Sequence, residues 1–293
     1  AKEHDERLVK EPVQNLEAYT LFLKGLHFYN KVTPKNFKRA IEYFEKAIEL
    51  EPNYAYAYAM LAEAYAFLGS TGQMQPSDAF ALVHKYSDKA LQLDSTLSAG
   101  YAAKGSAYLL YDWKWNEAYD SLQKAIELNP AATDAHQLLS FYYLITGKNS
   151  EAVAIMEKAL EADPLSPIVN KSLVDAYLIS GRADDALKQA ELLLEMYPQM
   201  RAALELKGWC VGAKGDWKKA AEIFEEVRLA INHPLKGFTP LGCAYANSGE
   251  TDKALGCIAK IEEWQTSEPG IVVDADLAMI WLTLGELDKA FYH

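Results

Sequence analysis

The sequence predicts an all-α protein, built as a solenoid of stacked helix pairs. Four segments repeat one pattern: KRAIEYFEKAIELEP, NEAYDSLQKAIELNP, SEAVAIMEKALEADP and DDALKQAELLLEMYP. A small residue near the start of this pattern recurs every 34 residues, which is typical of helical repeats. It is Ala118, Ala152, Ala186, Ala220 and Ala254, and Ala290 follows 36 residues later. Within each segment the apolar spacing is helical rather than alternating.

Each unit is predicted to contain two helices, a turn between them and a proline at its end. In the first unit, Ala40, Phe44 and Ala47 form one apolar stripe of the second helix. Pro52 then ends that helix, because proline lacks an N–H and clashes with the preceding turn. Glycine marks the turn between the helices in four units, at Gly147, Gly181, Gly215 and Gly249.

We expect a lead-in segment over residues 1–15, followed by seven complete units and a truncated eighth. The units span roughly 16–52, 53–95, 96–130, 131–164, 165–198, 199–232, 233–269 and 270–293. A single helix pair cannot bury its apolar face, so neighbouring units must stack. The sequence therefore predicts one continuous superhelix over residues 16–293, without an internal domain boundary. Its charged start, and its end just after a helix begins, indicate a part of a longer protein.

The repeat resembles the tetratricopeptide repeat over nearly the whole chain. The resemblance rests on the 34-residue period and on the spacing of Ala40, Phe44, Ala47 and Pro52. It implies a right-handed α-solenoid of about seven and a half helix pairs. The phrases NLEAYTLFLKGLHFYNKVTPKNFKRAIEYFEKAIELEP, YDWKWNEA and LNPAATDAHQ also look like the repeat region of multidomain bacterial signalling proteins. In those proteins an adenylate-cyclase, winged-helix or kinase domain precedes the repeats, so the resemblance implies the interaction or sensory arm of a regulator.

In this family the first helix of each unit lines a concave wall, on the face turned away from the second helix. Reading that face at i, i+3 and i+4 spacing gives a wall that is aromatic and apolar with a few charges. The candidate residues are Tyr19, Phe22, Leu26, Tyr56, Met60, Glu63, Phe67, Asp134, Gln137, Phe141, Lys171, Asp175, Glu205 and Trp209. We interpret the wall as a groove for a protein or peptide with apolar anchors, and a basic anchor as a further option. The alternative is that several of these side chains pack between units or lie under a missing flanking segment.

Three other functions stay open at this point. The chain could sense a small peptide or another ligand inside the superhelix. It could select substrates for an enzyme whose catalytic domain is absent from the sequence. It could also be a purely structural assembly module, and neither the partner nor the oligomeric state follows from the sequence.

Two tryptophans in the turn of the third unit need separate interpretations. Trp115 lies three residues before Ala118, as Trp217 lies three before Ala220, so packing at the start of the second helix is expected. Trp113 occupies the column of the turn glycines, in a turn one residue longer than theirs. It either covers an adjacent turn or is an exposed contact for a partner.

Composition and motifs exclude several classes of function. The net charge of −12 and the absence of a basic run argue against a nucleic-acid surface. No apolar run is long enough to insert into a membrane. We therefore expect a cytoplasmic protein, or a periplasmic one if a membrane helix precedes Ala1 in the native protein.

The sequence shows no catalytic or metal-binding signature. Phosphate-loop, nucleophile-elbow and zinc-protease motifs are absent, and the six histidines show no ligand spacing. Cys210, Cys243 and Cys257 form no CxxC pair and are interpreted as small apolar fillers in a reducing compartment. We expect a non-enzymatic chain without a cofactor or a metal ion.

Overall fold

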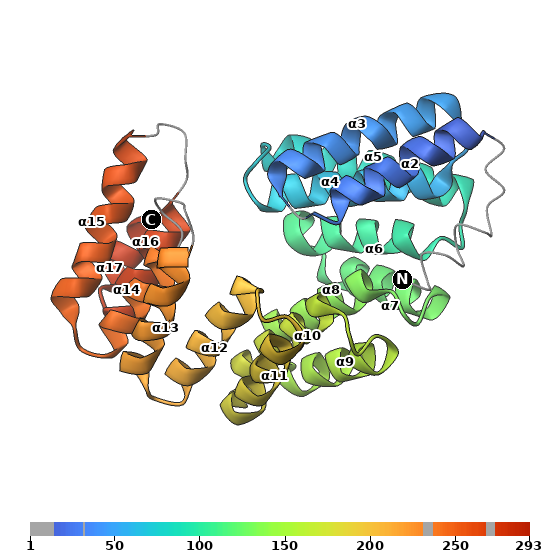
Figure 1. The fold of residues 1–293 in the computed structure, drawn as a ribbon. Coiled ribbons are helices and arrows are strands. Elements are labelled where there is room, and N and C mark those ends of the chain that lie inside the picture. The colour runs from blue at the N-terminus through green and yellow to red at the C-terminus, as the bar shows by residue number, and fades with distance from the viewer. Residues whose placement is uncertain (1–14, 32, 231–236, 268–272) are drawn as a thin grey trace. The chain divides into compact units, whose positions relative to one another are not determined.

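The chain forms a series of helix pairs, as Figure 1 shows. The computed structural model describes residues 15–31, 33–230, 237–267 and 273–293. Within them the first helices of the pairs are α2 (Leu16–Tyr29), α4 (Ala55–Ser70), α6 (Ser98–Ala107), α8 (Thr133–Ile145), α10 (Pro167–Ile179), α12 (Arg201–Ala213), α14 (Phe238–Asn247) and α16 (Asp274–Thr283). The second helices are α3 (Pro34–Leu50), α5 (Pro76–Leu93), α7 (Trp115–Leu128), α9 (Asn149–Ala162), α11 (Ala183–Met196), α13 (Trp217–Ala230), α15 (Thr251–Ser267) and α17 (Leu287–Tyr292). One pair falls in each predicted unit, which confirms the all-α fold class.

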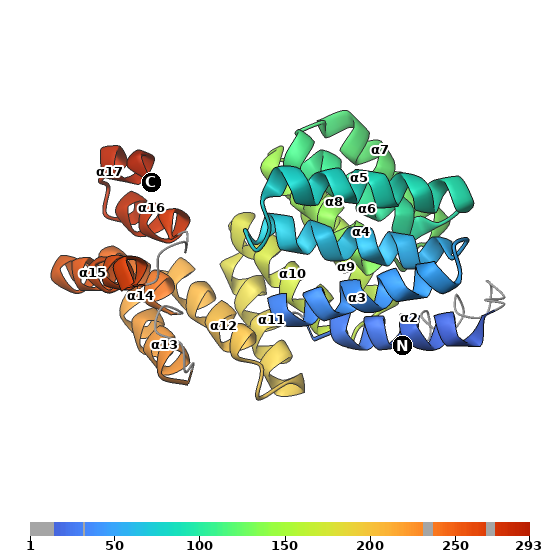
Figure 2. The same cartoon turned by 90° about the horizontal axis from the view of Figure 1, so that it is seen from above.

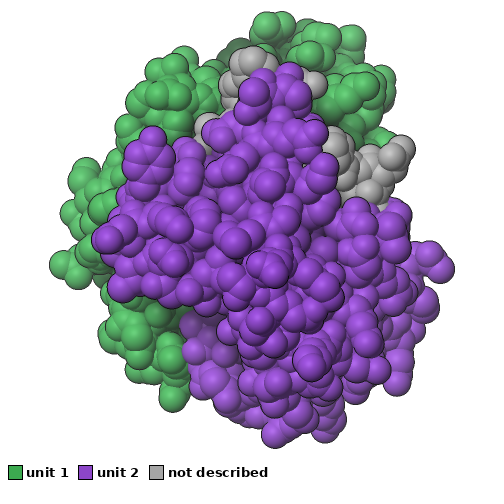
Figure 3. Space-filling view, turned by 90° about the vertical axis from the view of Figure 1, so that its left-hand side faces the viewer, with its two compact units in different colours: residues 1–155 green, residues 156–293 purple. Residues whose placement is uncertain are grey.

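The chain divides into two compact units, residues 1–155 and 156–293, coloured green and purple in Figure 3. The division falls inside α9, so we describe the two units separately. A single uninterrupted superhelix over residues 16–293 stays a prediction. The expected lead-in segment lies outside the described residues except for Asn15, whose side chain accepts hydrogen bonds from the first backbone N–H groups of α2.

In the first unit, α4 is the central helix of the packing. It contacts α3, α5 and α6, and α2 to α5 follow one another in Figure 2. Its sequence AYAYAMLAEAYAFLGS fits this position, because alanine lets neighbouring helices approach closely on several sides. Most of α4 is consequently buried, with Leu61, Ala62 and Ala64 fully excluded from solvent.

Close contact between the two helices of a pair depends on a small residue facing a large one. Gly25 of α2 faces Phe44 of α3, and Gly208 of α12 faces Phe224 of α13. A Cβ atom added at Gly208 would lie 2.5 Å from Cε1 of Phe224, far inside normal contact distance. Both phenylalanines are fully buried, so neither ring has free space to move into.

The turn glycines adopt the left-handed backbone conformation that ends a helix. Gly147 has φ +75° and Gly215 has φ +98°, angles that residues with a side chain rarely adopt. The backbone N–H of Lys148 donates to the carbonyl of Tyr143 at 2.8 Å, which closes the end of α8. This geometry explains the glycine column predicted from the sequence.

The packing at Gly208 can be tested by adding one methyl group. We expect Gly208→Ala to lower stability by about 1–3 kcal/mol, because the Phe224 ring must move out of a close-packed site. Gly256→Ala is the matched control, since a Cβ at Gly256 meets no atom within 4 Å. There, better helix propensity should raise stability by about 0.5–1 kcal/mol. Thermal unfolding followed by circular dichroism compares the two variants, and equal midpoints would contradict the packing described here.

Candidate functional site: the first-helix wall

A small pocket opens on the wall formed by the first helices of unit 1. Its volume is about 150 Å³, and we name it the first-helix pocket. It is lined by Tyr29, Glu63, Ala66, Phe67, Ser70, Ala102, Ala103, Ser106, Leu110, Asp134, Gln137 and Leu138. Pockets for small-molecule ligands usually measure 300–1,000 Å³, so this one has the size for a side chain rather than a metabolite.

Helical spacing brings the polar lining residues together from three helices. Tyr29 is the last residue of α2, and Glu63 and Phe67 lie one turn apart on α4. Asp134 and Gln137 lie in the first part of α8, where a carboxylate is favoured by the positive end of the helix dipole. Of these five residues, all except Tyr29 are among the wall candidates named from the sequence.

The pocket is acidic on one side and aromatic on the other. The Tyr29 hydroxyl donates a hydrogen bond to Oε2 of Glu63 at 3.1 Å. Removal from water raises the pKa of the Tyr29 phenol well above its usual range, and the nearby charges of Glu63 and Asp134 raise it further. The described residues that line the pocket include no lysine or arginine.

The aromatic side is rigid because its rings pack on one another. The Tyr29 ring meets Phe37 edge-on, with centroids 5.0 Å apart. Phe37 in turn stacks on Phe67 with centroids 3.9 Å apart. An apolar group entering the pocket would therefore meet a pre-formed surface.

Four predicted wall residues are buried and cannot contact a partner, so this part of the prediction was wrong. They are Phe22, Leu26, Tyr56 and Met60. The Phe22 ring is fully buried, with centroids 4.8 Å from Tyr54 and 5.3 Å from Tyr56. The physical reason is that each of these helices has more than one neighbour: α2 packs against α3 and against Tyr54 and Tyr56 of the next pair, and α4 contacts α3, α5 and α6.

Two further candidates in unit 1 lie outside the pocket lining. Tyr19 is half-buried near the start of α2. Phe141 of α8 lies one turn after Gln137 and is 45% exposed. Phe141 is thus the large apolar side chain among the predicted wall residues of unit 1 that is most available to a partner.

The candidates in unit 2 form a separate group. Lys171 and Asp175 of α10 pair with each other, Nζ to Oδ2, at 2.7 Å. Glu205 and Trp209 of α12 are half-buried. Because the Trp209 ring centroid lies 5.0 Å from that of Phe224, this side chain contributes to the core of its helix pair.

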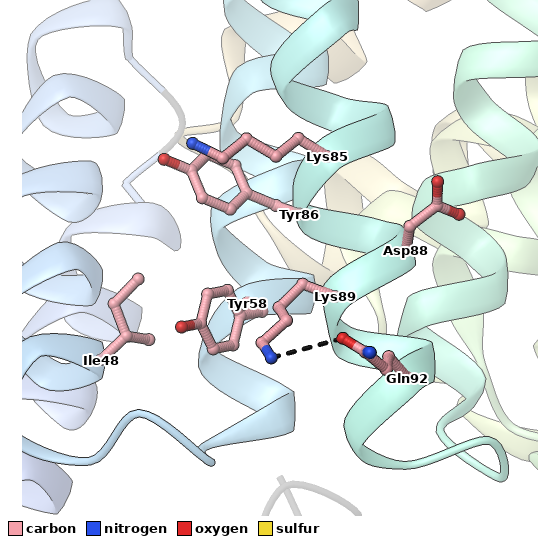
Figure 4. A pocket seen from close by; sticks show the side chains of 7 residues that line it. All are labelled: Ile48, Tyr58, Lys85, Tyr86, Asp88, Lys89 and Gln92. Atoms are coloured by element: carbon pink, nitrogen blue, oxygen red, sulfur yellow. Dashed lines mark hydrogen bonds between the residues drawn. The ribbon is translucent and has the colours of Figure 1, made fainter.

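Sequence reasoning missed a second hollow, on the side of unit 1 formed by α3 and α5. We name it the outer groove; its volume is about 620 Å³ (Figure 4). It is lined by Ile48, Tyr58, Lys85, Tyr86, Asp88, Lys89 and Gln92. One feature of the sequence pointed toward it: Lys85 and Lys89 are spaced i, i+4 in the second helix of the second unit, so they lie on one face of that helix.

The turn of the third pair contains the one left-handed residue other than glycine in the described chain. Trp113 has φ +56° and ψ +33° and takes the place of the turn glycines. The extra residue of this turn forms a π-helical turn, η1 (Tyr108–Asp112). The N–H of Lys114 consequently bonds to the carbonyl of Tyr108, six residues back, whereas Lys148 bonds five residues back in the glycine turn.

The side chains of this turn differ in exposure. Trp113 is 69% exposed, which favours an exposed contact over a cover for another turn. Trp115 is 41% exposed, so it packs less completely than expected from its buried counterparts Phe37 and Phe80. Nε2 of His84 lies 2.9 Å from Oδ2 of Asp112, which ties the end of η1 to α5.

The described residues contain no cluster of three or more His, Cys, Asp or Glu side chains that could hold a metal ion. All three cysteines are buried and unpaired, as predicted. Burial raises the pKa of the Cys210 thiol to about 12, so this group stays protonated and unreactive near neutral pH.

In the same described part of the chain, every helix is too short or too polar to cross a membrane.

These features define an all-α helical-repeat protein. Models of the tetratricopeptide repeat match residues 43–76 and 143–210. These two segments therefore contain tetratricopeptide repeats, as the period and the Ala–Phe–Ala–Pro spacing predicted.

The chain is also similar to a bacterial regulator over part of its length. It is 22% identical to the transcriptional regulator HilA of Salmonella typhimurium over 166 residues. That match covers 45% of this chain and 30% of HilA.

Solved structures share the fold at low sequence identity. A tetratricopeptide-repeat protein of Parabacteroides merdae has a TM-score of 0.58 and 17% identity, covering 92% of this chain and 100% of its own. The Cut9–Hcn1 structure has a TM-score of 0.68 and 16% identity, and the match covers 99% of this chain and 56% of that one. Human IFIT1, solved with m7Gppp-AAAA, has a TM-score of 0.67 and 15% identity, and the match covers 92% of this chain and 68% of that one. At these identities the likeness shows the fold alone, and the binding properties must be argued from the site.

Trp113 can be tested for backbone strain independently of any partner. We expect Trp113→Gly to raise stability by about 1 kcal/mol, because glycine adopts the left-handed conformation without a steric penalty. Gly147→Ala in the equivalent turn should lower stability by a similar amount. Chemical unfolding compares both variants with the parent chain. A loss of stability in Trp113→Gly would show that the indole packs rather than projects.

Proposed function

We propose that the chain is a non-enzymatic scaffold that binds a protein or peptide segment along its first-helix wall. The observation that carries this proposal is the first-helix pocket, which has two carboxylates on one side and an aromatic rim on the other. Its dimensions match a single anchoring side chain. Anchors of this kind, seated in pre-formed pockets, contribute much of the affinity of peptide recognition.

The chemistry of the pocket supports a partner with apolar anchors and a basic anchor. A guanidinium or ammonium group would lie between Glu63 and Asp134, with its aliphatic stem against Phe67 and Leu138. Apolar neighbours in the partner would reach Phe141, one turn further along α8. A carboxylate anchor is disfavoured because it would meet like charges.

We further propose that the chain is the interaction or sensory arm of a larger bacterial regulator. The partial match to HilA and the resemblance to repeat regions of signalling proteins support this role. Binding at the wall would then bias the orientation or assembly of an attached output domain. A cytoplasmic location fits this role best, and a periplasmic one would fit if a membrane helix precedes the chain.

Isosteric removal of the pocket charges tests the basic anchor. The probe is a labelled nonapeptide with one arginine between leucines, compared with the same peptide carrying glutamine. We expect Glu63→Gln and Asp134→Asn each to weaken binding of the arginine peptide by about tenfold, the loss of one charge-assisted contact. Fluorescence anisotropy measures the affinities, and Glu42→Gln on the exposed face of α3 is the control.

Two outcomes would contradict the proposal. One is equal affinity of the parent chain for the arginine and glutamine peptides, which would remove the basic anchor. The other is unchanged binding in Phe141→Ala together with both charge variants, which would place the binding surface away from this wall. Circular dichroism of each variant separates lost binding from lost folding.

A further inference from the structure

The outer groove has a positive wall supplied by α5. Lys85 and Lys89 lie one helical turn apart and both line the groove. The ammonium group of Lys89 donates to the neutral amide oxygen of Gln92 at 3.3 Å. That of Lys85 lies 5.0 Å from the centre of the Tyr86 ring (Figure 4). Neither lysine forms an ion pair with a carboxylate in the described part of the chain.

Two acidic residues lie near the groove, and one of them is paired with a lysine outside it. Asp88 lies on the same helix but pairs with Lys104 of α6, Oδ1 to Nζ, at 2.6 Å. Glu45 of α3 is not among the lining residues; it accepts a hydrogen bond from the Tyr65 hydroxyl at 3.3 Å and keeps its negative charge. Burial and, after it, this charge raise the pKa of Tyr86. The groove lining therefore contains two lysines without an ion pair and one carboxylate, Asp88, that is already paired with Lys104, in a chain whose net charge is −12.

The rest of the groove is apolar and aromatic. Tyr58 of α4 lies between α3 and α5, with its ring centroid 6.2 Å from that of Tyr86 (Figure 4). Ile48 of α3 supplies the opposite wall. Removal from water raises the pKa of the Tyr86 phenol, so its hydroxyl remains a neutral hydrogen-bond donor at physiological pH.

We propose that the outer groove docks an acidic segment of a partner protein. A carboxylate side chain of the segment lies between Lys85 and Lys89, and an adjacent apolar side chain packs on Tyr58 and Ile48. Complementarity of charge selects this occupant, and a volume of about 620 Å³ admits several side chains rather than one. The site is separate from the first-helix pocket, whose charge is opposite, and it does not depend on the function proposed for that pocket.

Charge reversal on α5 tests the docking site in the complete chain. The probe is a nonapeptide in which glutamates alternate with leucines, labelled with a neutral dye, and the same peptide with glutamines is the reference. We expect the acidic peptide to bind, and the double variant K85E/K89E to weaken its affinity by more than tenfold. K85Q/K89Q should lose a smaller part of the affinity. Glu63→Gln in the first-helix pocket should leave binding of this peptide unchanged.

The matched control carries the same change in net charge at a different place. It is K24E/K38E, on exposed positions of α2 and α3 outside the groove, and its affinity should stay within twofold of the parent value. Hydrogen exchange with the bound peptide should show protection in α3 and α5. Equal weakening in both double variants, or no binding to the parent chain, would overturn the proposal.

Two other occupants give distinct results. Displacement of the peptide by low millimolar inorganic phosphate alone would reassign the groove to small anions. A dimer detected by sedimentation without peptide, and abolished by K85E/K89E, would reassign it to a second copy of this chain. Either result overturns docking of an acidic partner segment.

Discussion

The structure depends on how closely the two helices of each pair can approach. A helix pair exposes apolar surface until a neighbour covers it, so every contact must be repeated along the chain. Gly25 against Phe44 and Gly208 against Phe224 show the solution, in which a residue without a side chain receives a large ring. Because these rings are fully buried, the helices of a pair have little freedom to move apart or together. The positions of all other side chains on the first helices follow from that close approach.

This constraint determines which residues remain for binding. The central helix α4 contacts α3, α5 and α6, which leaves only a narrow strip carrying Glu63 and Phe67. A side chain can therefore be large and aromatic yet unavailable, as Phe22 is. The first-helix pocket occurs where strips from successive first helices meet, with Tyr29 from α2, Glu63 and Phe67 from α4, and Asp134 from α8. A binding surface of this kind can change its specificity without disturbing the buried contacts that hold the pairs together.

The sequence was sufficient to predict the helix pairs and four residues of the pocket lining, Glu63, Phe67, Asp134 and Gln137. Repetition makes this possible, because each helix of a unit is aligned with its counterparts in the others. The prediction failed for Phe22, Leu26, Tyr56 and Met60, since a helical wheel divides a helix into two faces whereas these helices contact more than one neighbour. The outer groove was not predicted, and the i, i+4 pair Lys85 and Lys89 alone would not have shown which residues face it. Its lysines come from α5, its floor from α4 and its far wall from α3, and no periodicity within one helix reports their meeting.

The turn at Trp113 shows how the repeat accommodates an added residue. Inserting one residue into a helix would rotate everything after it by about 100°. Ala118 and Leu122 of α7 would then leave the core, where both are fully buried. The π-helical turn confines the insertion to Tyr108–Asp112, so α7 keeps its orientation toward α6. Neither the insertion nor the packing requires tryptophan at the left-handed position, where glycine occurs in the equivalent turns. Trp113 is mostly exposed at a position that costs backbone energy, and its role as a contact for a partner stays a prediction.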